Sequence, residues 1–88
     1  MDDTDHINFE APASLRKWPS LMNERASNAI VTYLVLEGTL DECIRKLMTK
    51  PASQHHLYEI HTAPQGELIS PVLSAKHILE IARLRDFL

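Results

Sequence analysis

The sequence predicts a small α+β domain in which two helices, a β-hairpin and a third helix follow one another. Apolar residues recur at helical spacing over residues 21–37 and again over residues 40–50. Residues 55–62 alternate as a strand does, and a third helical stripe follows Ser74. We therefore assign residues 14–88 to one α+β domain and residues 1–13 to a flexible acidic arm.

The N-terminal arm is predicted from composition. Residues 1–13 are acidic, then polar, with too few apolar groups to offset the entropy of ordering. Phe9 is the side chain that could dock on the core. Ser14 is then expected to cap a single turn that Pro19 ends. Trp18 is expected to cover the core, and an exposed binding anchor is the alternative.

The first long helix is predicted from about Leu21 to Glu37. Its apolar stripe consists of Met22, Ala26, Ala29, Ile30, Tyr33, Leu34 and Leu36. Val31 and Val35 lie on the other side, so we expect the C-terminal half of this helix to be covered on two sides. The alternative is a buried strand over residues 30–36, which are rich in β-branched and aromatic side chains.

The second helix is predicted to begin directly after the first ends. Gly38 is expected to take the left-handed conformation that closes a helix. Thr39 and Glu42 have the spacing of a capping box, so the next helix should start at Leu40. Its apolar stripe consists of Leu40, Cys43, Ile44, Leu47 and Met48. Pro51 places its end near Lys50.

A hairpin and a last helix complete the predicted domain. Alternation over residues 55–62 places His55, Leu57, Glu59 and His61 on one face of a strand. Residues 63–66 are expected to turn, and residues 67–73 to return as a strand with an open side at Pro71. Ser74 should then cap a helix over residues 75–87.

Composition indicates an ordinary globular protein. The chain has 88 residues, of which 44% are hydrophobic and 24% charged, and a formal net charge of −3. The acidic balance argues against broad nucleic-acid binding, which needs clustered cations. A single cysteine, an acidic N-terminus and the absence of a long apolar run predict a cytoplasmic protein without a membrane partner.

We expect a protein without enzymatic activity, cofactor or metal. The chain has only two glycines and lacks a phosphate-binding loop, a nucleophile elbow and a zinc-protease motif. Cys43 is expected to be a buried structural thiol. His55 and His61 would lie about 20 Å apart on an extended strand, too far to share one ion, and Glu59 with His61 supplies only two ligands.

The predicted function is protein–protein interaction or regulation, with the chain forming a homodimer. The alternative to the homodimer is a monomer whose C-terminal residues fold back over the hairpin. A two-stranded hairpin is marginal alone, so its first strand should remain an edge or pair with a second copy. The expected partner-binding residues are Tyr58, Leu84, Phe87 and Leu88. Such edge pairing would use the backbone of the first hairpin strand.

The alternative function is DNA binding by a helix-turn-helix regulator. The two predicted helices and the following hairpin have the outline of that motif. Arg45, Lys46 and Lys50 would be the DNA-binding cations of the second helix. Asp41 and Glu42 in its first turn argue against this alternative, because their charges repel phosphate.

Overall fold

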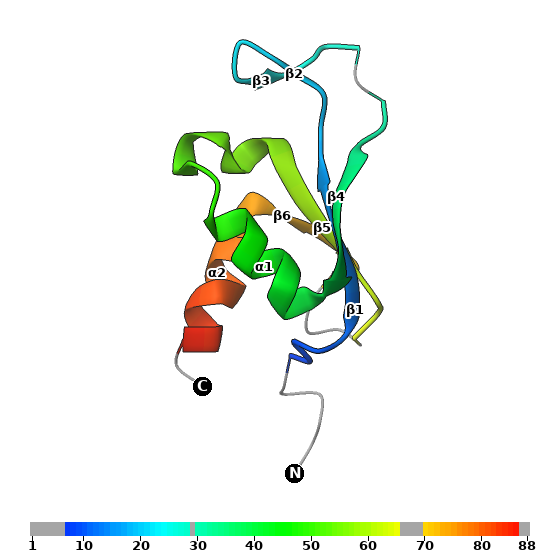
Figure 1. The fold of residues 1–88 in the computed structure, drawn as a ribbon, viewed down its shortest axis with the longest axis vertical. Helices are drawn as coiled ribbons and strands as arrows, with labels where there is room; N and C mark the ends of the chain where they lie inside the picture. The colour runs from blue at the N-terminus through cyan, green and yellow to red at the C-terminus, as the bar shows by residue number, and fades with distance from the viewer. Residues whose placement is uncertain (1–6, 29, 66–69, 87–88) are drawn as a thin grey trace.

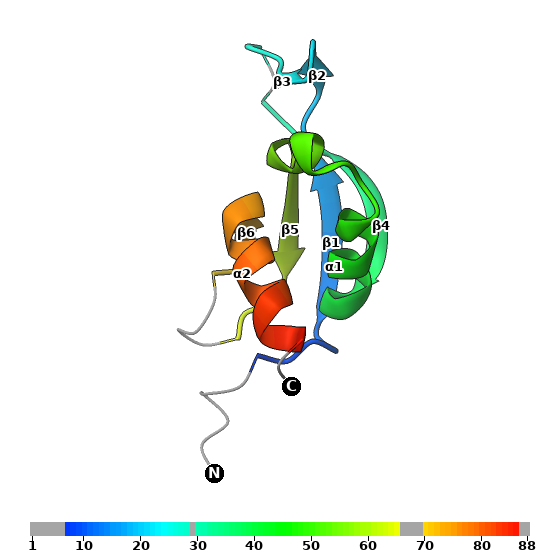
Figure 2. The same ribbon diagram turned by 90° about the vertical axis from the view of Figure 1, so that its left-hand side faces the viewer.

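A four-stranded antiparallel sheet forms the centre of the protein, and two helices cover one of its faces (Figure 1, Figure 2). The computed structural model describes residues 7–28, 30–65 and 70–86. The elements are β1 (Pro12–Lys17), β2 (Ser20–Leu21), β3 (Glu24–Arg25), β4 (Tyr33–Thr39), α1 (Leu40–Met48), η2 (Ala52–Leu57), β5 (Tyr58–Thr62), β6 (Val72–Ser74) and α2 (Ala75–Asp86). The α+β class is confirmed, but the order of elements differs from the prediction.

The central strand of the sheet is β1. It pairs with β4 on one side and with β5 on the other, in the sheet order β4-β1-β5-β6. Ala13 and Leu15 are buried under the helices, while Ser14 and Arg16 are only partly buried on the opposite face. The single turn predicted after Ser14 is therefore wrong, because two neighbouring strands provide the hydrogen bonds that a short helix would lack.

The long helix predicted over residues 21–37 is also wrong. The structure has a small hairpin of β2 and β3 there, followed by β4. Met22 and Ile30 of the predicted stripe are 90% and 87% exposed, and Val31, expected to be covered on the other side, is 68% exposed, so none of the three has a core to pack on. The strand alternative was nearer, because β-branched and aromatic residues favour the extended chain that pairs with β1.

The β2–β3 hairpin projects beyond the end of the main sheet (Figure 1, Figure 2). Its two-residue turn holds Met22 and Asn23 at φ values of 55° and 62°, the left-handed values of a type I′ turn. Asn23 connects the β2–β3 hairpin to η2. Its side-chain amide donates to Ser53 O at 3.0 Å, and its carbonyl accepts from His56 Nε2 at 2.8 Å.

Helix α1 begins where the sequence predicts. The hydroxyl of Thr39 accepts a hydrogen bond from the Glu42 amide at 3.1 Å, and Glu42 Oε1 accepts from the Thr39 amide at 3.0 Å. The capping box is thus confirmed. Gly38 does not close a preceding helix, because it is the sixth residue of β4.

Residues 7–13, which we assigned to the flexible N-terminal arm, contribute to the folded domain. Ile7 and Phe9 pack against the core, and Ala11 is buried. The Phe9 and Ala11 carbonyls accept hydrogen bonds from the first turn of α1. This segment therefore satisfies two of the backbone donors that a helix start leaves unpaired. Residues 1–6 of the predicted arm lie outside the described part of the chain.

The predicted hairpin is present in a shorter form. Residues 52–57 form the 3-10 helix η2, so the strand begins at Tyr58 rather than at His55. Glu59 pairs with Ser74 and His61 with Val72 across β5 and β6. The predicted turn at residues 63–66 and return strand from residue 67 lie partly outside the described residues. The last helix is confirmed as α2 over Ala75–Asp86.

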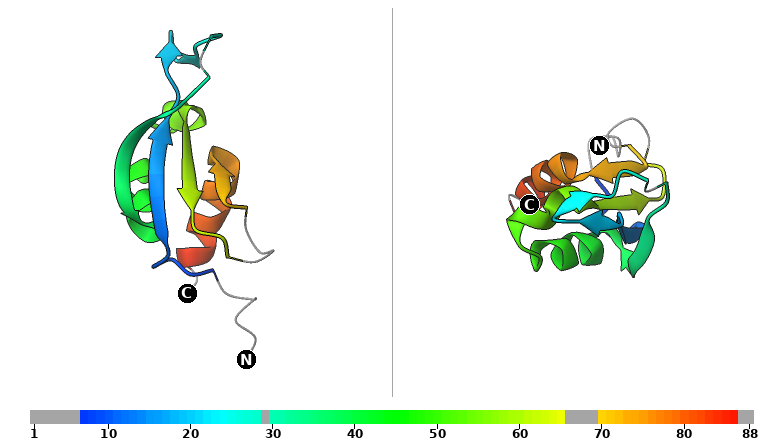
Figure 3. Two further views of the ribbon diagram at one scale, coloured as in Figure 1. Left: turned by 90° about the vertical axis from the view of Figure 1, so that its right-hand side faces the viewer. Right: turned by 90° about the horizontal axis from the view of Figure 1, so that it is seen from above.

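The hydrophobic core lies between the sheet and the two helices. Its largest fully buried side chains are Leu15, Leu40, Ile44, Leu47, Leu57, Ile60, Leu73 and Ile78. They come from β1, both helices, η2, β5 and β6. The opposite face of the sheet is covered by no described helix, as the left view of Figure 3 shows. The sheet therefore has one packed face and one open face.

Candidate functional site

The two outer strands of the sheet differ in how well they are protected from further pairing. β6 has three residues and follows Pro71, which has no N–H to donate. Short length and proline both protect an edge. β4 has seven residues, contains neither proline nor a basic side chain, and pairs with β1 alone among the described strands. It carries Glu37 and a register shift opposite Leu15 and Arg16, both of which limit edge pairing, but its outer side faces no other described strand (Figure 3).

Exposed apolar side chains lie along β4 and just before it. Tyr33 and Leu34 are each 50% exposed, and Ile30 and Val31 precede them in the open. Val35 and Leu36 pack against the core but are only partly buried. An edge strand with this composition is a typical site for pairing between chains.

The predicted partner-binding residues are not gathered in one place. Tyr58 is 6% exposed and belongs to the core, with Lys17 Nζ 5.9 Å from the centre of its ring. Its ring thus offers almost no surface to a partner. Leu84 is 46% exposed on α2. Phe87 and Leu88 lie outside the described residues. β5, which we expected to be an edge, lies between β1 and β6.

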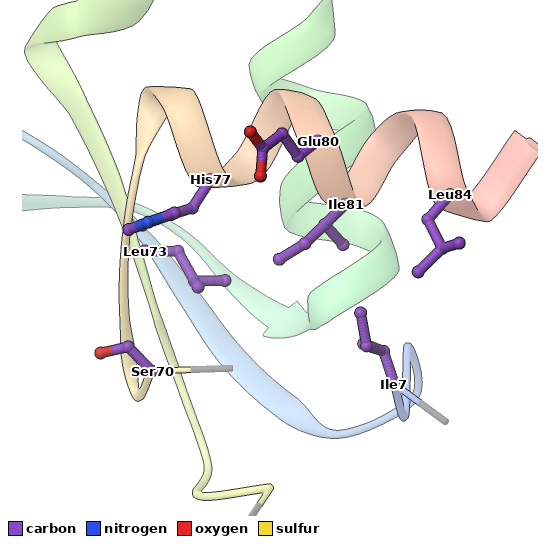
Figure 4. Close-up of a pocket in the computed structure, with 7 residues that line it drawn as sticks. All are labelled: Ile7, Ser70, Leu73, His77, Glu80, Ile81 and Leu84. Carbon is purple, nitrogen blue, oxygen red and sulfur yellow. The ribbon is translucent and has the colours of Figure 1, made fainter. Parts of the chain in front are cut away.

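Leu84 lines a pocket of about 320 Å³ beside α2 (Figure 4). Figure 4 shows Leu73 and Ile81 on its floor, with Ile7 opposite Leu84. Ser70, His77 and Glu80 complete the lining, all three exposed to solvent. His77 Nδ1 lies 3.3 Å from the Ser74 hydroxyl. The pocket could take a small apolar side chain, but its polar groups do not converge on a common point.

A connected group of polar side chains lies on the open face of the sheet. Trp18 Nε1 donates a hydrogen bond to Glu59 Oε1 at 2.7 Å, and Glu59 Oε2 contacts His61 Nε2. The side chain of Glu59 is 16% exposed and that of His61 40%. Alternation along the strand predicted that Glu59 and His61 share a face, and β5 confirms it. Both oxygens of Glu59 are engaged.

Two arginines adjoin this group. Arg16 pairs in register with Glu59 across β1 and β5, yet it forms no ion pair with any described residue. The guanidinium of Arg25 lies 4.0 Å from the centre of the Trp18 ring. This cation–π contact joins the β2–β3 hairpin to the residue that follows β1. The sequence offered Trp18 as a binding anchor only as the alternative, and nothing in it placed Arg16 and Trp18 beside Glu59, because β1 was not foreseen.

Ser14 faces His61 across β1 and β5, and His61 contacts Glu59. Serine, histidine and a carboxylate are the residue types of a hydrolytic triad. A triad needs a hydrogen bond between the serine and the histidine, and donors for the oxyanion. None of the hydrogen bonds among the described residues joins Ser14 to His61. We therefore assign no nucleophile to this face.

The cations expected to bind DNA do not form part of a helix-turn-helix. The strand β4, rather than a helix, precedes the Thr39 turn. Arg45 is exposed on α1, where its Nε lies 2.7 Å from Asp41 Oδ2. Lys46 is exposed and Lys50 is half-buried just after the helix. The ion pair between Arg45 and Asp41 reduces the positive charge that α1 can offer to phosphate.

The remaining histidines make structural contacts. His55 is buried, and its Nε2 lies 2.9 Å from the Lys50 carbonyl. It belongs to η2, whereas Glu59 and His61 belong to β5. Within residues 7–28, 30–65 and 70–86, no group of three or more histidine, cysteine or acidic side chains is placed to hold a metal ion.

Cys43 is fully buried on α1, under β1. Burial raises the pKa of its thiol from 9.0 to about 11, and the nearby charge of Glu42 adds to this effect. A thiol with a raised pKa is a poor nucleophile at neutral pH, because little of it is thiolate. The geometry favours the structural role that the apolar stripe predicts.

No protein-family model, curated protein or solved structure matches the chain. Among the described residues, no helix has the length and apolar character needed to cross a membrane. Function must therefore be inferred from the surfaces of the domain itself.

Proposed function

We propose that the protein is a non-enzymatic interaction module that works as a homodimer, and that β4 is its interface. The observation that carries this proposal is the contrast between the two sheet edges. β6 is short and preceded by Pro71, whereas β4 is the longest of the described strands and is flanked by exposed apolar side chains. A protein that must avoid all edge pairing has reason to protect both edges.

Two-fold symmetry fixes how two copies would meet. The same strand of each copy pairs with itself, and antiparallel pairing joins two four-stranded sheets into one of eight strands. The axis then runs perpendicular to the sheet, so the helices of both copies cover the same face. Val35 and Leu36, only partly buried in the single chain, would become covered near the axis.

The test compares two glutamate substitutions of matched design. Leu34 on β4 and Val72 on β6 are 50% and 46% exposed, and their register partners are Arg16 and His61. A glutamate at either position has a basic neighbour within its own chain, so both variants should fold. With Val35 and Leu36 at the axis, a glutamate at position 34 would also face Glu37 of the second copy, which repels it.

Sedimentation equilibrium at tens of micromolar protein provides the readout. We expect a dimer for the wild type and for Val72→Glu, and a monomer for Leu34→Glu. Circular dichroism should show that all three proteins are folded. A monomeric wild type, or a Leu34→Glu variant that dimerises as strongly as Val72→Glu, would contradict the proposal.

A further inference from the structure

We infer that the open face of the sheet carries a binding site for a small organic anion with an apolar portion. The site is a shallow cavity of about 380 Å³, within the size range of small-ligand sites. It is lined by Arg16, Trp18, Ile30, Val31, Thr32, Glu59 and His61. All of these side chains belong to one chain, and two of them, Ile30 and Val31, also flank the β4 edge of the proposed dimer.

The interior of the site is held in place by hydrogen bonds. Glu59 is fixed between the Trp18 indole and the His61 ring. The contact with Glu59 uses Nε2 of His61, which leaves Nδ1 as the other ring nitrogen. Because both oxygens of Glu59 are engaged, the carboxylate is poorly placed to hold an incoming cation.

The charge of the cavity favours an anion. Arg16 lines it and forms no ion pair with any described residue, and a guanidinium can bind a carboxylate or phosphate through two parallel hydrogen bonds. Arg25 adds a second guanidinium at the Trp18 ring. Glu59 is the acidic side chain of the lining and is already engaged by Trp18 and His61, so Arg16 is the charged group of the cavity that is left to a ligand.

The apolar portion of the ligand has its own surface. Ile30 and Val31 border the cavity and are 87% and 68% exposed, which is costly for side chains of their size. The Trp18 ring adjoins them. A ligand whose anionic group reaches Arg16 would lay its apolar body against these three residues and remove them from water.

Trp18 is the only tryptophan of the chain, so its fluorescence reports on the site directly. Benzoate and phenyl phosphate serve as probes that share the chemistry and differ in the anionic group, and benzylamine is the cationic counterpart. We expect a saturable change with at least one of the two anions below about 10 mM, and none with benzylamine. Amide chemical shifts of residues 16, 18, 59 and 61 should move in the same titration.

Three substitutions separate the site from unspecific binding. Arg16→Gln should weaken binding of the anion about tenfold or more, through loss of charge-assisted hydrogen bonds. Val31→Glu, at an exposed position where folding is not at risk, should also weaken it. Arg45→Gln, on the helix side of the molecule, is the matched control and should leave affinity unchanged.

Three results would overturn the inference. The first is the absence of saturable binding by either anion. The second is binding of benzylamine as strong as that of the anions. The third is an affinity of both Arg16→Gln and Val31→Glu equal to that of Arg45→Gln.

Discussion

A Cβ atom built on Gly38 would lie 2.8 Å from Oε1 of Glu42, so the glycine leaves the space that the capping carboxylate occupies. The same oxygen accepts the hydrogen bond of the Thr39 amide. The capping contact at the start of α1 thus depends on the absence of a side chain at position 38, near the end of β4.

This dependence predicts a non-additive pair of substitutions. Alanine in a strand is more stable than glycine by about 0.5–1 kcal/mol, but at position 38 it displaces the Glu42 carboxylate and costs a hydrogen bond of about 1 kcal/mol. Gly38→Ala should therefore change the stability of the wild type little and stabilise the Glu42→Ala variant. Urea unfolding of the four proteins should give a coupling free energy of about 1 kcal/mol. Effects that add within roughly 0.3 kcal/mol would show that the two residues are independent.

Cys43 predicts a loss of stability at high pH. The pKa of its thiol is about 11 in the folded chain and 9.0 as a model value, with burial as the main cause. The folded state holds its proton more tightly, so this contribution is complete below pH 9 and disappears as the pH rises to 11. Over that interval the free energy of unfolding should fall by about 2 kcal/mol more in the wild type than in Cys43→Ala. Parallel pH profiles of the two proteins would rule out this linkage.

The turn between β2 and β3 predicts a stabilising substitution. Met22 has φ 55° and is 90% exposed, so a side chain with little tolerance for the left-handed region sits there without a packing gain. Met22→Asn should raise the free energy of unfolding by about 0.5–1 kcal/mol, since asparagine adopts this conformation more readily. Leu21→Asn is the control, because Leu21 is in β2 and is similarly exposed. An equal response of the two variants to thermal denaturation would exclude the backbone explanation.

Local signals predicted the parts of the fold that depend on local interactions. The capping box of Thr39 and Glu42 lies within four residues, and it located the start of α1 correctly. Strand alternation placed Glu59 and His61 on one face. In α2, the helical stripe after Ser74 needed no distant partner to be recognised.

The central strand could not be predicted in the same way. β1 has six residues with a polar flank, and it is stabilised by β4 and β5, which lie far along the chain. Residues 30–36 were ambiguous for the same reason, because pairing with β1 decides between helix and strand. The candidate anion site combines residues of β1 with residues of β5, so it could not be assembled without that pairing. The alternation of Ala13 and Leu15 with Ser14 and Arg16 was the available clue, but it spans only four residues.

The position of β1 also determines the order in which the sheet can be completed during synthesis. The strand leaves the ribosome first and can form a hairpin with β4 early, while its other side stays unpaired until β5 has been made. Until β5 has emerged, a pair of β1 and β4 therefore presents two open edges instead of one. The hydrogen-bonding groups of β1 that face β5 are withdrawn from other nascent chains only after that strand has emerged and paired.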